Sequence, residues 1–347
     1  MKKTNLKSLT RNELNEWIQS QGENNYRAAQ LWSWLYQKNV IEFTRMTNVS
    51  RKFQSRLQQI AEIYTLEPIK SVRSERSGTE KFLWNLGNGN HIESVFIPEG
   101  NRRTLCISSQ VGCAVGCRFC ATATMGFVRN LEVHEIVEQV LAMERHVHMK
   151  PSNLVIMGMG EPMLNYENVI KALTILNHPD GAAIGHRKIT ISTSGIIPAI
   201  ERYTREKQPF KLAISLNATT DETRSKIMPI NKKYPLNQLM QAAKIYTQKI
   251  RKRITFEYVL LKGMNDSPED AQRLLRMLHG IPCKVNLIAY NAVGSSFQSP
   301  DNARIEAFAR MIRPLAAPVT LRLSKGNDIN AACGQLVTSG RSAGCST

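Results

Sequence analysis

The hydrophobic and polar positions of the first hundred residues follow two different periods. Thr10 and Glu13 form a capping-box pattern, and apolar residues recur behind it at helical spacing. Two further helical patterns follow over 28–35 and 53–63. Segments 81–86 and 91–97 instead alternate apolar and polar residues around a Gly- and Asn-rich turn, as in a β-hairpin. We expect a three-helix bundle and then a hairpin.

From about residue 104 the pattern changes to short apolar segments alternating with amphipathic ones. The predicted strands are 104–108, 153–157, 188–192, 210–216, 254–260, 283–290 and 319–323. The predicted helices are 132–143, 167–176, 198–203, 236–246, 268–278 and 303–312. Strands that alternate with helices predict right-handed βα units on a parallel sheet, either open or closed into a barrel. The tail after residue 337 is small and polar, so we expect it to fray.

Composition narrows the class of protein. Hydrophobic residues make up 42% of the chain, which is enough for a full core and excludes general disorder. No apolar run approaches the roughly 20 residues that a membrane span needs, and no signal peptide is evident. The expected compartment is therefore the cytoplasm. There, the seven cysteines are better explained as metal ligands or catalytic thiols than as a disulfide framework.

The chain is strongly basic, with a formal net charge of +18. Residues 201–262 hold 14 basic and 5 acidic side chains, a net of +9, which is half of the excess. Such a charge predicts a polyanionic partner, and nucleic acid is the leading candidate. Because the basic residues alternate with apolar ones, we expect them to cover one side of a folded domain. The alternative is a charge that serves only solubility.

Three cysteines stand close together in the chain. Cys113, Cys117 and Cys120 form a Cys-x3-Cys-x2-Cys motif directly after the first strand of the βα series, with Phe119 before the last cysteine. Three thiolates on a glycine-containing loop suit an iron–sulfur cluster. A [4Fe–4S] cluster has four irons, so three ligands would leave one iron open for a substrate. The alternative is a zinc loop with His134 or another histidine as the fourth ligand.

This motif resembles that of the radical S-adenosylmethionine (SAM) superfamily. The resemblance implies a partial (βα)6 barrel and one [4Fe–4S] cluster held by three cysteines. It also implies that the open iron binds SAM and that electron transfer releases a 5′-deoxyadenosyl radical. An external donor such as flavodoxin or ferredoxin would supply the electron.

Polar residues at the ends of the predicted strands fit the same resemblance. In parallel barrels, the C-terminal ends of the strands carry the site. The Gly-Met-Gly-Glu-Pro segment at 158–162 resembles the superfamily's cofactor-binding motif, in which Glu161 would take up an ammonium group. The predicted SAM contacts are Gly160, Glu161, Ser192, Ser215, Leu216, Asn217 and Asn291. Many relatives have His where this chain has Asn217, so any role that needs an imidazole is in question.

Longer strings resemble the RlmN/Cfr family of radical RNA adenine methyltransferases. They are Glu-Ser-Val-Phe-Ile-Pro at 93–98, Cys-Ile-Ser-Ser-Gln-Val-Gly-Cys at 106–113 and Gly-Asn-Asp-Ile-Asn-Ala-Ala-Cys-Gly-Gln-Leu at 326–336. Shorter strings at 26–30 and 77–79 match as well. The resemblance implies an N-terminal RNA-binding domain over 1–98, made of the helical bundle and the hairpin. The radical SAM core with its catalytic-cysteine loop would then span 99–337, before a flexible tail over 338–347.

The family chemistry needs two more thiols. Adenine C2 and C8 are electrophilic, so a polar methyl transfer cannot reach them. The resemblance implies that Cys333 takes a methyl group from one SAM and that a second SAM supplies the radical that activates it. The resulting protein–RNA thioether would be resolved by Cys106, with a transient disulfide to Cys333. Glu93 matches the proton acceptor, although Cys106 could share that task. We expect Cys283 and Cys345 to take no part in the chemistry.

The resemblance implies that the substrates are adenosine 2503 of 23S rRNA and adenosine 37 of tRNA. The RlmN branch methylates C2 and the Cfr branch methylates C8 of the same rRNA adenosine. The Cfr branch tends to have a cysteine where this chain has Val111, so we favour C2. We expect a monomer without a membrane partner. The rival interpretations are C8 methylation, a methylthiotransferase and a noncatalytic RNA-binding protein with a zinc loop.

Overall fold

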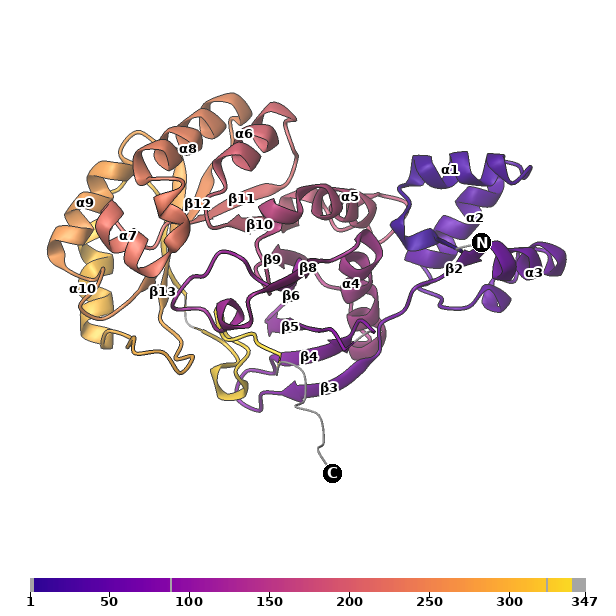
Figure 1. The fold of residues 1–347 in the computed structure, drawn as a ribbon, viewed down its shortest axis with the longest axis horizontal. Coiled ribbons are helices and arrows are strands. Elements are labelled where there is room, and N and C mark those ends of the chain that lie inside the picture. The colour runs from indigo at the N-terminus through magenta and orange to yellow at the C-terminus, as the bar shows by residue number, and fades with distance from the viewer. Residues whose placement is uncertain (1–2, 88, 323, 339–347) are drawn as a thin grey trace.

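The N-terminal unit in the computed structural model is a small helical domain (Figure 1). The structure describes residues 3–87, 89–322 and 324–338. The domain contains β1 (Thr4–Asn5), η1 (Leu6–Ser8), α1 (Arg11–Ser20), α2 (Tyr26–Tyr36), η2 (Phe43–Arg45), α3 (Arg51–Ile60) and β2 (Ala61–Glu62). The predicted capping box is present: Thr10 caps the Glu13 N–H, and the Glu13 carboxylate accepts from the Thr10 N–H. α3 ends at Ile60, before the predicted limit of 63, because the chain there pairs with β1.

A ten-stranded sheet forms the centre of the molecule, in the order β14-β13-β12-β11-β10-β9-β6-β5-β4-β3. Its strands are β3 (Pro68–Arg73), β4 (Glu80–Asn85), β5 (His91–Glu99), β6 (Arg102–Ile107), β9 (Asn153–Ile156), β10 (Ile189–Thr193), β11 (Lys211–Ser215), β12 (Ile254–Leu260), β13 (Cys283–Ala289) and β14 (Val319–Arg322). The strands from β6 to β14 pair in parallel, whereas β3, β4 and β5 pair antiparallel. The predicted α/β fold with a partial barrel is confirmed.

We expected the hairpin to belong with the helical bundle, but it lies in the central sheet. Strand β5 pairs with β6, with Val95 opposite Cys106, so the hairpin extends the central sheet. Strand β3, which we did not predict, pairs with β4 at the outer edge of the same sheet. The alternation of residues showed that a hairpin exists, but it could not show which strand lies beside it.

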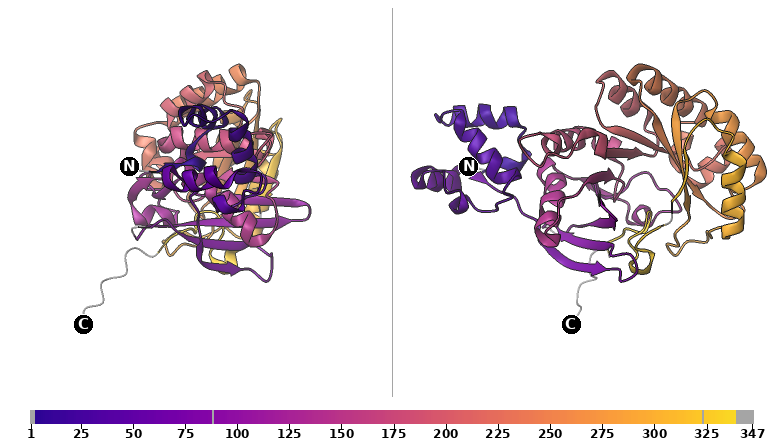
Figure 2. Two further views of the ribbon diagram at one scale, coloured as in Figure 1. Left: turned by 90° about the vertical axis from the view of Figure 1, so that its right-hand side faces the viewer. Right: turned by 180° about the vertical axis from the view of Figure 1, so that it is seen from behind.

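Helices cover the convex face of the curved sheet (Figures 1 and 2). They are α4 (Val133–Val147), α5 (Tyr166–Asn177), α6 (Ile197–Arg205), α8 (Leu236–Ile250), α9 (Pro268–Leu278) and α10 (Asn302–Ile312). Their apolar faces pack on the sheet with buried side chains such as Val140, Leu239 and Phe308. Short elements not predicted from the sequence are α7 (Asp221–Ile227), η4 (Pro162–Asn165), η5 (His186–Lys188), η6 (Pro229–Lys232) and η7 (Asn327–Ile329).

The helical domain is joined to the core through a buried ionic contact. Lys7 pairs with Glu138 on α4, and both side chains are fully buried. Arg145 pairs with the other oxygen of the same carboxylate. Burying charged groups destabilises the folded protein unless each of them is paired with an opposite charge. This contact therefore fixes how the helical domain sits on the core.

None of the helices within the described residues is long and apolar enough to cross a membrane. Thr338 is the last described residue of the chain. Most of the tail predicted over 338–347, including Cys345, therefore lies outside the described residues.

Candidate active site

A small hairpin positions the three-cysteine loop. Strands β7 (Gln110–Gly112) and β8 (Phe127–Asn130) pair antiparallel at the base of the loop, which includes η3 (Ala121–Met125). The Cys113 N–H donates to the Gly126 carbonyl at 2.7 Å. Gly112 has a φ of +71°, and a Cβ atom there would lie 1.8 Å from the Gly126 oxygen. Only glycine lets the two strands approach so closely.

The three thiols lie close enough to influence one another. Burial, together with the charges of Glu161 and Cys120, raises the pKa of Cys113 to about 12. Burial also raises the pKa of Cys117 well above its ordinary value, with added effects from Cys120 and Cys113. A site that disfavours the free thiolates of Cys113 and Cys117 needs a positive group to hold them, which an iron–sulfur cluster supplies. These residues therefore fit the cluster that the motif implies.

A zinc site fits these residues less well. His134 Nδ1 is hydrogen-bonded to the Ser8 hydroxyl at 2.9 Å, and its ring stacks edge-on with Tyr64, at the contact with the helical domain. Nowhere in the described chain do three His, Cys, Asp or Glu side chains converge tightly enough for a single metal ion. Zinc needs such convergence, whereas the thiolates of a cluster bind different iron atoms.

The predicted SAM contacts line the carboxyl ends of neighbouring strands. Glu161 is buried, and its two carboxylate oxygens accept from the Met163 N–H at 3.0 Å and the Ser194 N–H at 2.7 Å. Gly160 packs on Gln110 so closely that a Cβ atom would lie 2.5 Å from that side chain. Ser192 lies on β10, and Ser215, Leu216 and Asn217 follow one another at the end of β11.

The Asn217 side chain already has partners in the protein. Its φ is +56°, a conformation that asparagine tolerates better than most residues. Its Oδ1 accepts from the Val259 N–H at 2.9 Å, and its backbone carbonyl accepts from the Asn265 side chain at 2.7 Å. Asn217 therefore fixes the turn after β11, whereas its contact with SAM stays a prediction.

Arg224 corrects one sequence inference. It belongs to the basic segment 201–262 that we expected on the surface, yet it is fully buried. Its guanidinium donates to the carbonyls of Ser194, Ser215 and Leu216 at 2.6–3.1 Å. Burial lowers its pKa to about 10, and the nearby Cys117 opposes that shift. Arg224 thus ties two strand ends together beside the three-cysteine loop. Its sequence context gave no signal of this role.

The loop that carries Cys333 is held directly against the three-cysteine loop. The Ala121 N–H donates to the Gly334 carbonyl at 2.7 Å, and the Thr122 hydroxyl donates to the Leu336 carbonyl at 2.6 Å. The Asn291 side chain donates to the Cys333 carbonyl at 3.0 Å. The described structure therefore brings Cys333 and the cluster motif together.

Cys106 lies on one face of the sheet, and Cys333, in the loop after η7, is close enough for its charge to act on Cys106. Both are free thiols, so their transient disulfide stays a prediction. Burial, together with the charge of Cys333, raises the pKa of Cys106 to about 12. Cys333 is exposed on one side, but the surrounding protein still reduces its hydration. That desolvation, with the charges of Glu257 and Cys120, raises its pKa to about 12.

Glu93 lies on the same face, because Val95 on β5 is directly opposite Cys106 on β6. The Glu93 carboxylate is buried, with Oε1 at 2.9 Å from the Lys81 ammonium and Oε2 accepting from the Val337 N–H at 2.9 Å. Burial raises its pKa, which Lys81 opposes. A carboxylate with a raised pKa is suited to accept a proton near neutral pH.

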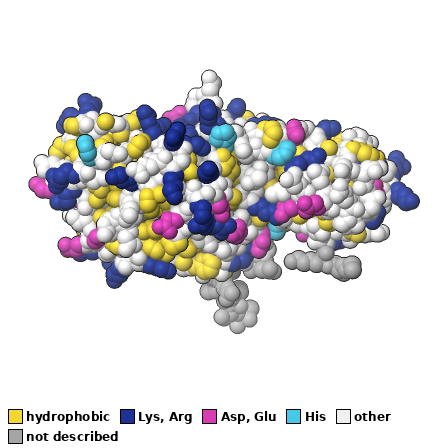
Figure 3. All heavy atoms as spheres, turned by 90° about the horizontal axis from the view of Figure 1, so that it is seen from above, with side chains coloured by type: hydrophobic (Ala, Val, Ile, Leu, Met, Phe, Trp, Pro, Cys, Tyr) yellow, Lys and Arg dark blue, Asp and Glu magenta, His cyan; other side chains and the backbone are white. Residues whose placement is uncertain are grey.

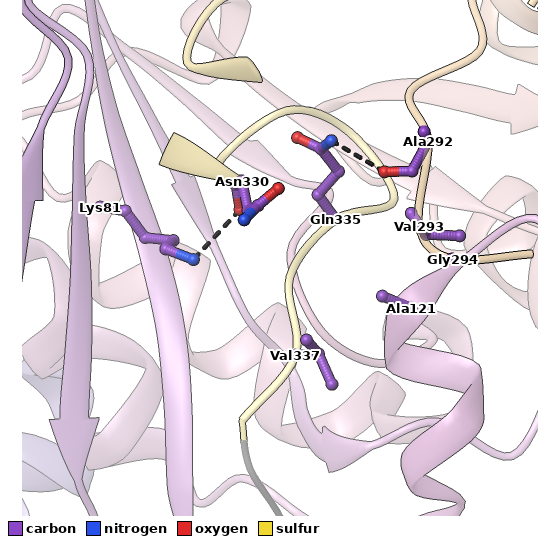
Figure 4. A pocket seen from close by; sticks show the side chains of 8 residues that line it. All are labelled: Lys81, Ala121, Ala292, Val293, Gly294, Asn330, Gln335 and Val337. Carbon is purple, nitrogen blue, oxygen red and sulfur yellow. Dashed lines mark hydrogen bonds between the residues drawn. The ribbon is translucent and has the colours of Figure 1, made fainter. Parts of the chain in front are cut away.

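A cavity of about 540 Å³ opens between these segments (Figure 4). Its lining residues are Lys81, Ala121, Ala292, Val293, Gly294, Asn330, Gln335 and Val337. The Gln335 side chain donates to the Ala292 carbonyl at 3.0 Å, which holds one wall together. The cavity lies beside the Cys333 loop and is within the size range of small-molecule sites.

Sequence reasoning missed one buried carboxylate. Glu257 on β12 lies between Ser215 and Asn286 on the neighbouring strands and is 5% exposed. Its Oε1 accepts from the Asn286 side chain at 2.8 Å, while Oε2 has no hydrogen-bond partner in the described structure. Burial raises its pKa. An acidic residue in the middle of an apolar strand was the available signal.

Basic side chains are scattered over the face of the molecule drawn in Figure 3. In the segment 201–262, every Lys and Arg except Arg224 is at least partly exposed. They are carried by α6, β11, α7, η6, α8 and the connecting loops. Figure 3 shows several Lys and Arg side chains gathered near the middle of one face. Such a face offers charge that complements a phosphate backbone.

Comparison with known proteins agrees with this arrangement. Residues 107–275 match the model of the radical SAM superfamily, and residues 4–63 match that of the ribosomal RNA large subunit methyltransferase N-terminal domain. A dual-specificity RNA methyltransferase RlmN from Pelobacter propionicus is 47% identical over 96% of both chains. A second RlmN, from Geotalea uraniireducens, is 47% identical over 97% of both chains.

This chain belongs to the RlmN family. A crystal structure of a radical SAM methyltransferase from Sphaerobacter thermophilus is 41% identical and has a TM-score of 0.91. The alignment covers 96% of this chain and 99% of that one. Membership of the RlmN family and the radical SAM fold are thereby confirmed, whereas the individual roles of the site residues stay predictions.

Proposed function

We propose that this protein is a radical SAM methyltransferase that makes 2-methyladenine in 23S rRNA and in tRNA. One observation carries the proposal: the Cys333 loop is hydrogen-bonded directly to the three-cysteine loop. A thiol that is to be methylated and then activated by a radical must stand beside the centre that generates the radical. Cys106 and Glu93 on the same face supply the second thiol and the proton acceptor that this chemistry needs.

The residues on the two loops have separate tasks in this proposal. Cys113, Cys117 and Cys120 hold the [4Fe–4S] cluster. Gly160, Glu161, Ser192, Asn291 and the segment 215–217 bind SAM. When bound, the cluster and SAM supply a 5′-deoxyadenosyl radical. Cys333 accepts a methyl group from SAM, and that methyl group, after losing one hydrogen atom to the radical, bonds to the adenine carbon. As this carbon loses its proton to Glu93, the adduct gives up its unpaired electron to the electron carrier. Cys106 then attacks the Cys333 sulfur, so that a disulfide forms, the S–CH2 bond breaks, and the released carbon takes up a proton to become the methyl group of the product. Two SAM molecules are used for each turnover.

The raised pKa of Glu93 supports its assignment as proton acceptor. Its carboxylate must be ionised to act, so this step should fail as the pH falls through its pKa. Adenine C2 is the proposed target because Val111 stands where Cfr-type enzymes tend to have a cysteine. The proposal places the reaction in the cytoplasm, where these RNAs are found. It also includes a monomeric enzyme and an external electron donor such as flavodoxin or ferredoxin.

The most direct test of this chemistry is anaerobic purification followed by metal analysis and peptide mass spectrometry. We expect a brown protein with about four irons per chain. After incubation with SAM, the peptide carrying Cys333 should gain one methyl group. The Cys333→Ala variant should keep its iron and lose the methylated peptide. Cys283→Ala, which changes a buried cysteine elsewhere on β13, should behave like the wild type. A colourless protein with one zinc would overturn the proposal.

A further inference from the structure

Lys81 connects two groups that the proposed reaction uses. It lies on β4, where Lys81 is opposite Val95 and Leu83 is opposite Glu93 on β5. Lys81 and Glu93 are therefore diagonal neighbours on the same face of the sheet. This is also the face of Cys106, which lies opposite Val95 on the other side. The register thus places a cation beside the base, on the face of the sheet that also carries Cys106.

The Lys81 ammonium contacts both Glu93, the proposed base, and the loop that carries Cys333. It lies 2.9 Å from Glu93 Oε1 and donates to the Asn330 carbonyl at 3.1 Å. Figure 4 shows the side chain reaching along the cavity toward Asn330. Only 15% of the Lys81 side chain and 6% of the Glu93 side chain are exposed, so their pairing is poorly screened by water.

The loop is fastened on both sides of Cys333. Lys81 holds the Asn330 carbonyl on one side, and the second Glu93 oxygen accepts from the Val337 N–H on the other. Neither bond involves the thiol itself. A Lys81–Glu93 pair that grips the loop at these two points fixes the distance between the base and Cys333.

We propose that Lys81 is a positioning residue for the proton-transfer step: it holds Glu93 ionised and aimed, and it clamps the Cys333 loop against that base. This inference rests on the proposed function. In the step concerned, one proton moves from the adduct carbon to Glu93, and the C–H electron pair stays with the adenine ring. Glu93 becomes neutral, so its ionic contact with Lys81 is lost until the proton leaves.

The charges around Glu93 give the direction of the pH effect. Burial raises the pKa of Glu93, while the Lys81 charge and the Val337 N–H lower it. On the facing elements, the thiols of Cys106 and Cys333 have pKa values of about 12, far above the acid limb of the pH–rate profile. The charges of Arg322 and Glu257 act on those thiols, whereas Lys81 is the charged side chain that acts on Glu93. Without the Lys81 charge the pKa of Glu93 rises further. The base is then protonated over a wider range of pH.

The test compares product formation between pH 6 and 9 for the full-length holoenzyme, with tRNA and a 23S rRNA fragment as substrates. In Lys81→Met we expect normal iron content and a normal S-methyl group on Cys333. The acid limb of the pH–rate profile should move to higher pH by about one unit or more, because loss of a close opposite charge raises the pKa of a carboxyl group by that amount. Unresolved protein–RNA adduct should accumulate. Lys81→Arg should restore the limb.

Lys325→Met is the matched control, because Lys325 also pairs with a glutamate, Glu99, at 2.9 Å. It should leave the pH profile unchanged. If Lys81→Met loses its iron or no longer melts cooperatively, Lys81→Gln becomes the test variant, because it keeps a hydrogen-bond donor without the charge. Lys81→Gln should still shift the acid limb of the pH–rate profile to higher pH. An unshifted limb with no accumulated adduct would overturn the role of Lys81. A wild-type enzyme that forms no methylated RNA would instead overturn the proposed function.

Discussion

The raised pKa values of the two proposed catalytic thiols favour their protonated form near neutral pH. Loss of hydration raises the pKa of both Cys333 and Cys106 to about 12, and the negative charge of Glu257 adds to this effect at Cys333. A thiolate is the nucleophile in alkyl transfer, so neither thiol should react readily on its own. The positive sulfonium of SAM would favour the thiolate once it is close. The site therefore restrains the thiol until its methyl donor is bound.

The raised pKa of Cys333 predicts that its thiol reacts slowly with alkylating reagents near neutral pH. Iodoacetamide should alkylate Cys333 at least ~100-fold more slowly at pH 7.5 than it alkylates a free cysteine, because the thiolate fraction is so much smaller. The rate should rise about tenfold for each pH unit up to about pH 11. Peptide mass spectrometry over a time course measures both. Rapid alkylation at pH 7.5 would contradict the raised pKa.

The hairpin of β7 and β8 is the element that positions the three-cysteine loop. Its two strands close through the hydrogen bond from Cys113 to Gly126. Gly112→Ala should break this closure, because the new Cβ atom would meet the Gly126 oxygen at 1.8 Å and the φ of +71° disfavours alanine. We expect the variant to fold but to bind less than half of the wild-type iron. Iron analysis and circular dichroism check both points.

Gly185→Ala is the control for this change, since no atom lies within 4 Å of its added Cβ and its φ is −56°. It should bind iron like the wild type. If Gly112→Ala also bound a full complement of iron, the hairpin would not be what shapes the loop.

Most elements were predictable because their patterns are local. Strand β12 and helix α9 begin and end at the predicted residues, as strong apolar alternation and a Ser-Pro helix start require. Strand β3 was missed because its side chains are largely exposed and its pattern is weak. The short helix α7 is mostly polar, so it gave no helical periodicity.

Contacts between distant segments were not predictable in the same way. The Thr122 hydroxyl and the Leu336 carbonyl are 214 residues apart in the chain. The strings around Cys113 and Cys333 indicated shared chemistry only through resemblance to a family. Lys81 and Arg224 had no such string, and their positions follow from strand register and burial, which a single sequence does not reveal.

At the scale of the whole molecule, the helical domain is fixed to the core through Lys7, Glu138 and Arg145. Burial lowers the pKa of Lys7, and Glu138 opposes this shift. Lys7→Met removes a buried charge from one oxygen of Glu138, while Arg145 still holds the other. We expect a loss of about 3 kcal/mol in the free energy of unfolding, measured with urea.

Lys171→Met is the matched control, because it breaks a second contact between the two units, Lys171 with Glu13 at 2.7 Å. That pair is partly exposed, so its loss should cost less than about 1 kcal/mol. Equal losses from the two variants would show that the buried charge group does not dominate the contact between domain and core.

We propose that this protein methylates C2 of adenine in RNA through Cys333. The most direct measurement is mass spectrometry of nucleosides from 23S rRNA and tRNA after incubation with the reduced holoenzyme and SAM. We predict 2-methyladenosine with the wild type and none with Cys333→Ala. Methylation at C8, no methylation by the wild type, or 2-methyladenosine formed by Cys333→Ala would contradict the account.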